Sequence, residues 1–214
     1  MNAPAPIPQH PNLVAALEKL YDVFSAPPPP VIEGCPCCID TRGVDVLLST
    51  PLRELSGKVL WRYITGAYLT VGGDRDFRYL LPRIFDLSAF SPFEIPDTEI
   101  VLGKLARARW TTWETLEREA VWQFVDAWFD YALEQDLRDG AEGWLVGSRA
   151  ESILCGAAYA GMPLSGWLAR LLEPRAAPLL ADLVERYPNG MSAFWEDAPG
   201  GLEQLSPILA RGSA

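Results

Sequence analysis

The sequence contains a single histidine, His10, which stands in a proline-rich stretch before the first apolar pattern. Ser-His-Asp and Cys-His hydrolases require an imidazole that is held rigidly in a pocket, as do zinc and non-haem iron sites bound by histidine. A histidine among prolines does not supply such a group. The scarcity of histidine therefore argues against all of these mechanisms.

Other markers of catalysis are also missing from the sequence. There is no GxSxG or GxGxxG pattern. There is also no P-loop, since Gly103-Lys104 lacks the upstream glycine of a phosphate-binding loop. No apolar run approaches the roughly 18 residues at which a membrane-spanning helix becomes plausible. The first eleven residues do not resemble a secretory signal, so we expect a cytoplasmic protein whose thiols stay reduced.

The composition is that of a folded, acidic protein. Of the 214 residues, 49% are hydrophobic and eight are tryptophan, enough to form a sizeable core. Aromatic residues at helical spacing are expected mainly in that core, although aromatics also line ligand grooves. The net charge is −10 and the pI about 4.6, which disfavours binding to nucleic acids or anionic membranes.

The spacing of apolar residues predicts an all-α protein of about eight to ten helices. We expect residues 1–11 to form a flexible proline-rich arm and residues 12–214 to form one helical domain. Short connections marked by Gly or Pro favour antiparallel neighbours. An irregular multi-helix bundle and a short arrangement of HEAT-like helical repeats both fit, although no fixed sequence period is visible.

Several local patterns make sharper predictions. Thr111 with Glu114, and Ser148 with Glu151, match capping boxes that would open two helices. The first of these helices carries apolar residues on two faces and is expected at the centre of the fold. The segment "VDVLLST" at 44–50 has the character of a short strand without a partner. Pro82 is expected to kink its helix or divide it into two.

Three of the four cysteines lie within four positions, in the segment Cys35-Pro36-Cys37-Cys38. The spacing suits a zinc site, but the fourth ligand would have to be Cys155, His10 or a carboxylate. Cys155 lies on the apolar helix face of "SILCGAAYAG" and is expected to be buried there. It also suits a thiol-redox pair, although no βαβ pattern surrounds it. The third interpretation, which we prefer, is a tight turn of packed thiols.

The segment 72–83 combines acids and arginines at the start of a predicted helix. Asp74 and Asp76 suit a helix N-terminus, where the helix dipole stabilises ionised carboxylates, so a role as a carboxylate hydrolase is the least favoured hypothesis. Together with Arg75, Arg78 and Arg83, they are candidates for a polar edge that binds a partner.

Four segments, in the order "IEGCPCC", "PLRELSG", "TVGGDRDFRYLLPRIFDL" and "VLGKLARARWTTWETLE", resemble a family of uncharacterised bacterial proteins of about this size. The resemblance covers roughly residues 13–135, and "GDRDFRYLLPRI" is its most specific part. It implies a compact bacterial helical fold and a cysteine segment shared by the group. It implies no activity.

These observations favour a non-catalytic helical module for protein–protein interaction or scaffolding. The alternative from a different class is a metal-binding or thiol-redox protein built on Cys35, Cys37 and Cys38, with zinc as the possible cofactor.

If the clustered thiols are packed into a turn, we expect elemental analysis of the purified protein to find no bound zinc. A thiol reagent should then fail to react with them in the folded protein and react fully after denaturation. Stoichiometric zinc, or rapid reaction of the cluster in the folded state, would instead support the alternative.

Overall fold

The computed structural model describes residues 10–35, 44–143 and 147–212, and within these ranges it confirms the all-α prediction. The described residues form ten α-helices, with short 3₁₀ turns in several of the connections. Their β-type pairing is limited to two isolated backbone bridges. The helices are α1 (Pro11–Val23), α2 (Val44–Ser49), α3 (Gly57–Gly66), α4 (Asp74–Phe90), α5 (Thr98–Arg107), α6 (Thr115–Ala141), α7 (Ser148–Tyr159), α8 (Ser165–Leu171), α9 (Ala177–Arg186) and α10 (Pro199–Gly212).

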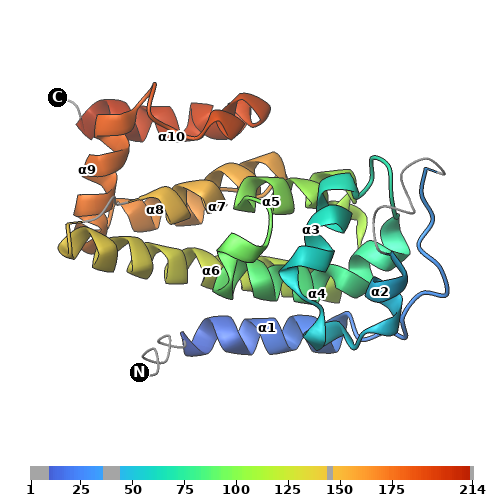
Figure 1. Ribbon diagram of the computed structural model, residues 1–214. Coiled ribbons are helices and arrows are strands. Elements are labelled where there is room, and N and C mark those ends of the chain that lie inside the picture. Colours follow the sequence, from blue (N-terminus) through green and yellow to red (C-terminus); the bar gives the residue numbers. More distant parts are fainter. Residues whose placement is uncertain (1–9, 36–43, 144–146, 213–214) are drawn as a thin grey trace.

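Most helices lie in layers (Figure 1). α1 covers one side of α6, α7 lies on the opposite side of α6 beside α5, and α10 packs beyond α7. α9 runs across these layers and connects α6 with α10. Because the helices range from 6 to 27 residues and one crosses the others, the arrangement is an irregular bundle.

The 27-residue helix α6 is central, as its two apolar faces predicted. Phe124 and Trp128 pack with Phe85 of α4 on one side, where the Phe85 and Phe124 rings stack with centroids 5.0 Å apart. On another side, Phe129 meets the buried Trp167 of α8. A helix buried on both faces is held in one position by its neighbours.

α5 and α7 approach each other closely because each carries a glycine at the contact. A Cβ on Gly103 would lie 2.5 Å from the ring of Tyr159, and one on Gly156 would lie 2.9 Å from Leu102 Cβ and 3.1 Å from Glu99 Cα. These pairings also show that the two helices run in the same direction. Their N-terminal turns therefore lie at the same end of the contact.

The prediction of a strand is wrong, and of the two outcomes predicted for Pro82, a kink or a division of the helix, the division does not occur. Residues Val44–Ser49 form a helix, since a strand without a partner would leave its backbone N–H and C=O groups unpaired. Pro82 does not divide α4, which is continuous from Asp74 to Phe90. The proline removes one backbone hydrogen bond, but it lies in the buried part of the helix, where packing of the neighbouring side chains compensates for that loss.

Both predicted capping boxes are also wrong. Thr111 lies in a 3₁₀ turn, and α6 begins four residues later with Glu117 Oε2 accepting from the Glu114 N–H at 3.1 Å. The start is displaced because Trp113 adopts an extended backbone that buries its indole and lets Nε1 donate to the Ala108 carbonyl at 3.0 Å. In α7, Glu151 bonds to other elements instead of the helix start.

The close contact between α5 and α7 predicts opposite effects for two Gly→Ala substitutions. Gly156→Ala is expected to lower the free energy of unfolding by about 1–3 kcal/mol, because its methyl group overlaps Leu102. Gly166→Ala, at a helical position in α8 with nothing within 4 Å, should raise it by up to about 1 kcal/mol. Urea denaturation measures both, and equal shifts for the two variants would contradict the proposed contact.

Candidate functional site

A cleft of about 490 Å³ opens between the C-terminal end of α4, the segment leading into α5, the middle of α6 and the first turns of α7. We call it the α4–α7 cleft, and its lining comes from residues 88–99, 128–135 and 148–153. Three segments that are distant in sequence therefore meet at one place. It has the size and mixed lining of a ligand pocket.

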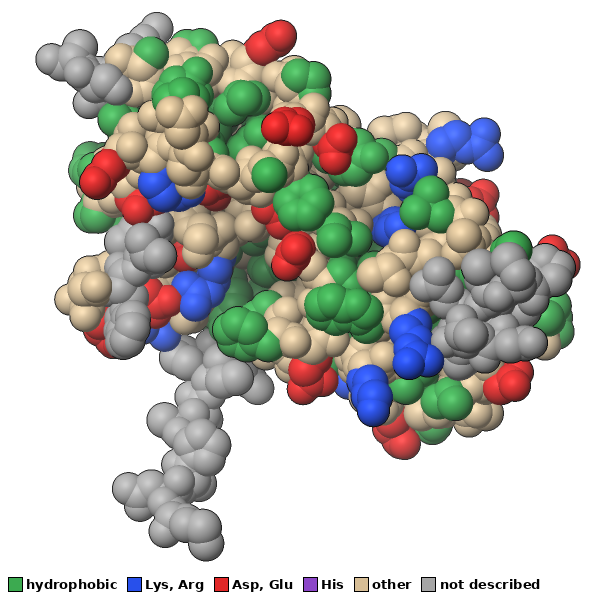
Figure 2. Space-filling model, turned by 45° about the horizontal axis from the view of Figure 1, so that its top comes forward, with side chains coloured by type: hydrophobic (Ala, Val, Ile, Leu, Met, Phe, Trp, Pro, Cys, Tyr) green, Lys and Arg blue, Asp and Glu red, His purple; other side chains and the backbone are tan. Residues whose placement is uncertain are grey.

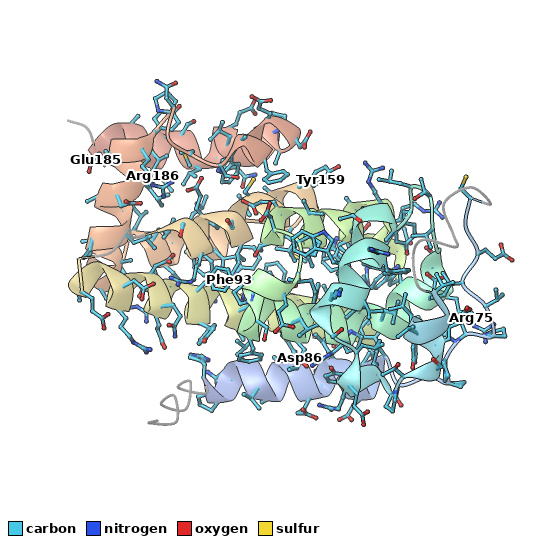
Figure 3. All side chains as sticks on the ribbon, viewed as in Figure 1. Arg75, Asp86, Phe93, Tyr159, Glu185 and Arg186 are labelled. Atoms are coloured by element: carbon cyan, nitrogen blue, oxygen red, sulfur yellow. The ribbon has the colours of Figure 1, made fainter. Side chains whose placement is uncertain are left out.

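Aromatic side chains form much of the wall of the cleft. Trp128 and Tyr131 come from α6, and Phe90 lies against Tyr131 with ring centroids 6.0 Å apart. Phe93, on the 3₁₀ turn Pro92–Glu94, is 97% exposed at the cleft and is labelled in Figure 3. A large aromatic side chain left in water beside a cleft is a typical feature of a binding surface.

Glu99, in the first turn of α5, supplies a carboxyl group to the cleft although it is only 5% exposed. Burial raises its pKa, and hydrogen bonds from its own backbone and from the hydroxyls of Ser192 and Ser152 oppose that effect in part. The Ser192 hydroxyl donates to Glu99 Oε1 at 2.8 Å. A buried acid with a displaced pKa in a cleft marks a candidate functional group.

Behind Glu99, a second acid is buried even more deeply. Glu151 is 2% exposed, and its Oε1 accepts from the Ser192 N–H at 2.7 Å and from Trp195 Nε1 at 3.1 Å. Arg186 of α9, labelled in Figure 3, donates from Nη1 to Glu151 Oε2. Ser192 thus bonds to both acids, and Glu151 works as a tertiary link between α7, α9 and the turn at 192–197.

Asp136 caps the N-terminus of α7 from the neighbouring helix α6. It is fully buried, and its carboxylate accepts the N–H groups of Ala150 at 2.9 Å and Arg149 at 3.4 Å. Arg149, which lines the cleft, also bonds through its guanidinium to Asp136 at 3.2 Å and to Asp139 at 2.6 Å. The positive charge of Arg149 is therefore already paired.

The acids of the predicted polar edge at 72–83 have structural partners. Asp76 is buried and accepts from the Tyr63 hydroxyl at 2.5 Å and from the Gly73 N–H at 3.0 Å. Burial raises its pKa, against the lowering effect of these hydrogen bonds. Asp74 accepts from the Tyr68 hydroxyl at 3.0 Å, and Gly73, not Asp74, is the N-cap of α4.

Two of the three arginines of this edge are also paired. Arg78 bonds to Glu117 at 3.2 Å and lies over the Trp113 ring. Arg83 donates to the Leu55 carbonyl at 2.8 Å and to Asp86 at 2.5 Å.

Arg75 is exposed and is labelled in Figure 3. None of the five edge residues lines the α4–α7 cleft, and their role in binding a partner stays a prediction.

The cysteine segment is only partly covered by the structure, since Cys37 and Cys38 lie outside the described residues. Cys35 is half-buried, and its N–H donates to the Thr70 carbonyl at 2.8 Å. Cys155 is fully buried as expected, and burial together with the charges of Glu99 and Glu151 raises its pKa. Among the described residues, no three His, Cys, Asp or Glu side chains are arranged to hold a metal ion.

His10 is the N-cap of α1, and its Nε2 lies 3.5 Å from Glu134 Oε1 on α6. This contact could not be predicted from the sequence, because it depends on how α1 packs against α6.

Sequence reasoning missed the cleft and Glu99. In the sequence, Glu99 is an ordinary acid in the first turn of a helix, and only the packing of α7 and the 192–197 turn against α5 buries it. The expectation that aromatics lie in the core holds for Trp128 and Tyr131, which are nearly buried and line the cleft at the same time.

No match to this chain was found among models of protein families, curated proteins or solved structures. The resemblance to uncharacterised bacterial proteins therefore stays a prediction. Within the described ranges, no helix combines the length and the apolar character needed to cross a bilayer.

The burial of Glu99 predicts how stability depends on pH. Its folded pKa lies above the unfolded value, so between the two the folded state keeps a proton that the unfolded state has lost. The contribution of Glu99 to the free energy of unfolding is therefore present at low pH and is lost as pH rises through this window. In Glu99→Gln, the free energy of unfolding measured by urea denaturation should fall less steeply with pH above about pH 4.5. An unchanged dependence on pH would contradict this account.

Proposed function

We propose that this protein is a helical module that binds a segment of a partner protein in the α4–α7 cleft. The observation that carries the proposal is the cleft itself, with nearly buried aromatic walls, a buried acid and Phe93 exposed beside it. Aromatic side chains contribute much of the energy in protein interfaces, because they bury a large area at little cost in conformational entropy.

The rigidity of the walls supports a binding role. Trp128 lies on the central helix, Glu99 lies at the close contact between α5 and α7, and Arg149 is held by two carboxylates. Elements that are fixed before binding reduce the entropy lost when a partner is ordered. The exposed position of Phe93 leaves one anchor available to a partner.

The chemistry of the lining favours binding over catalysis. Among the described residues that line the cleft there is no histidine, lysine or cysteine. Its serines therefore have no imidazole or amine beside them in the cleft to activate a hydroxyl as a nucleophile. Arg149, the arginine of the lining, bonds to Asp136, which caps α7.

The metal or thiol function remains the second proposal. Its support is the backbone hydrogen bond from Cys35 to Thr70, which holds the start of the cysteine segment against the loop between α3 and α4. A fixed backbone is what a metal site or a redox pair requires of its first cysteine. The elemental analysis and thiol titration described above distinguish this function from a packed turn.

The proposed function predicts that Phe93→Asp abolishes binding of the partner. The wild-type protein and each variant serve in turn as bait in an extract of the source cells. We expect Leu172→Asp to recover as much of the partner as the wild type does, and Phe93→Asp to recover at least about tenfold less. Leu172 is a matched control, because it is 58% exposed and lies at the end of α8, outside the cleft. Equal recovery with both variants, at equal stability, would exclude the cleft as the binding surface.

A further inference from the structure

The charges that line the α4–α7 cleft are unbalanced. Its charged lining residues are Asp97, Glu99 and Arg149. The guanidinium of Arg149 is already paired with Asp136 and Asp139, whereas Asp97 is exposed and forms no ion pair with another described residue, and Glu99 accepts only from neutral donors. The cleft therefore offers uncompensated negative charge to a ligand.

The carboxyl group of Glu99 has room for a further donor. A carboxylate has about four sites for accepting hydrogen bonds. The Ser192 hydroxyl reaches Oε1 from the side of the 192–197 turn, and Ser192 is not part of the cleft lining. The Ser152 hydroxyl, which lines the cleft, and the backbone N–H of Glu99 also bond to this carboxyl group, so about one of the four sites is left for a ligand.

The aromatic walls fit the same kind of ligand. Phe90, Trp128 and Tyr131 line the cleft around this acid, and Phe93 extends the aromatic surface into solvent. The negative face of an aromatic ring attracts ammonium and guanidinium groups, most strongly where water is excluded. The apolar stems of long basic side chains also pack well against such rings.

We propose that the α4–α7 cleft binds a lysine or arginine side chain of the partner segment, with the stem between the aromatic walls and the charged head at Glu99. This inference rests on the proposed function and names the chemistry that the cleft selects. Asp97 adds a second, exposed carboxylate that attracts the same head group. The space of about 490 Å³ accommodates one long side chain together with adjacent backbone.

The surface of the molecule agrees with a local, rather than a general, preference for cations. Figure 2 shows acidic and basic side chains interspersed over one face, together with scattered hydrophobic side chains. Selection of a basic side chain then depends on the few acids inside the cleft. Substituting those acids tests the idea directly, while an acid elsewhere on the surface serves as a control.

The test uses four small probes of matched shape, namely the N-acetyl, N-methylamide derivatives of lysine, arginine, norleucine and glutamate. Each is titrated into the full-length, isotope-labelled protein and followed by the backbone amide signals of residues 97–99, 128–135 and 148–153. We expect lysine and arginine to shift these signals and to bind at least about tenfold more tightly than norleucine, because of the desolvated ion pair. Glutamate should not bind.

Variants then assign the selectivity to particular acids. Glu99→Gln and Asp97→Asn should each weaken binding of the lysine probe, by about tenfold and about threefold respectively, since Asp97 is more exposed. Asp22→Asn, which removes the same charge at an exposed position on α1 outside the cleft, should leave binding unchanged. Because Asp97 is exposed, its variant keeps the test informative even if Glu99→Gln fails to fold.

Equal binding of lysine and norleucine, or no shift of the cleft signals by any cationic probe at millimolar concentration, would overturn the inference. So would equal losses in Asp97→Asn and Asp22→Asn. The proposed function is contradicted by a different result, namely undiminished recovery of the partner by Phe93→Asp. If partner binding requires Phe93 but norleucine binds as tightly as lysine, the proposed binding module stands and the preference for a cationic side chain is rejected.

Discussion

The burial of Glu151 is the constraint on which the C-terminal half of the structure depends. A carboxylate taken out of water is stable only when hydrogen bonds and opposite charge replace the lost solvent. Here the replacements come from Arg186 on α9 and from Ser192 and Trp195 in the following turn. These donors can meet one acid only if α7, α9 and the turn at 192–197 are assembled around it. Removing one donor would leave part of a buried charge unpaired.

The α4–α7 cleft follows from this arrangement. Ser192, held by Glu151 through its N–H, uses its hydroxyl to bond Glu99, so the position of one buried acid determines that of the other. The glycine contact between α5 and α7 places their N-terminal turns at the same end, and Asp136 completes the start of α7. The cleft therefore lies among elements that are individually fixed. Such a preformed site suits binding, since little order has to be created when a ligand enters.

The predictions of capping boxes that proved wrong show which features can be predicted from the sequence and which cannot. Ser148 and Glu151 have the spacing of a capping box, yet Asp136 of another helix caps α7 and Glu151 turns toward α9. A spacing rule compares residues within one turn and does not include donors from distant elements. The aromatic residues of α6 were correctly expected in the core. Trp128 and Tyr131 also face a cleft, and this depends on the tertiary structure, because residues 88–99 supply another part of the lining.

The sequence by itself determined the all-α class, the central place of α6 and the burial of Cys155, because each depends on apolar spacing along a single helix. The tertiary structure alone decided the burial of Glu99, the pairing of Arg149 and the meeting of three distant segments at the cleft. Burial and pairing depend on which surfaces come together in space. Two acids with the same local sequence pattern can therefore be a solvated charge in one protein and a binding group in another.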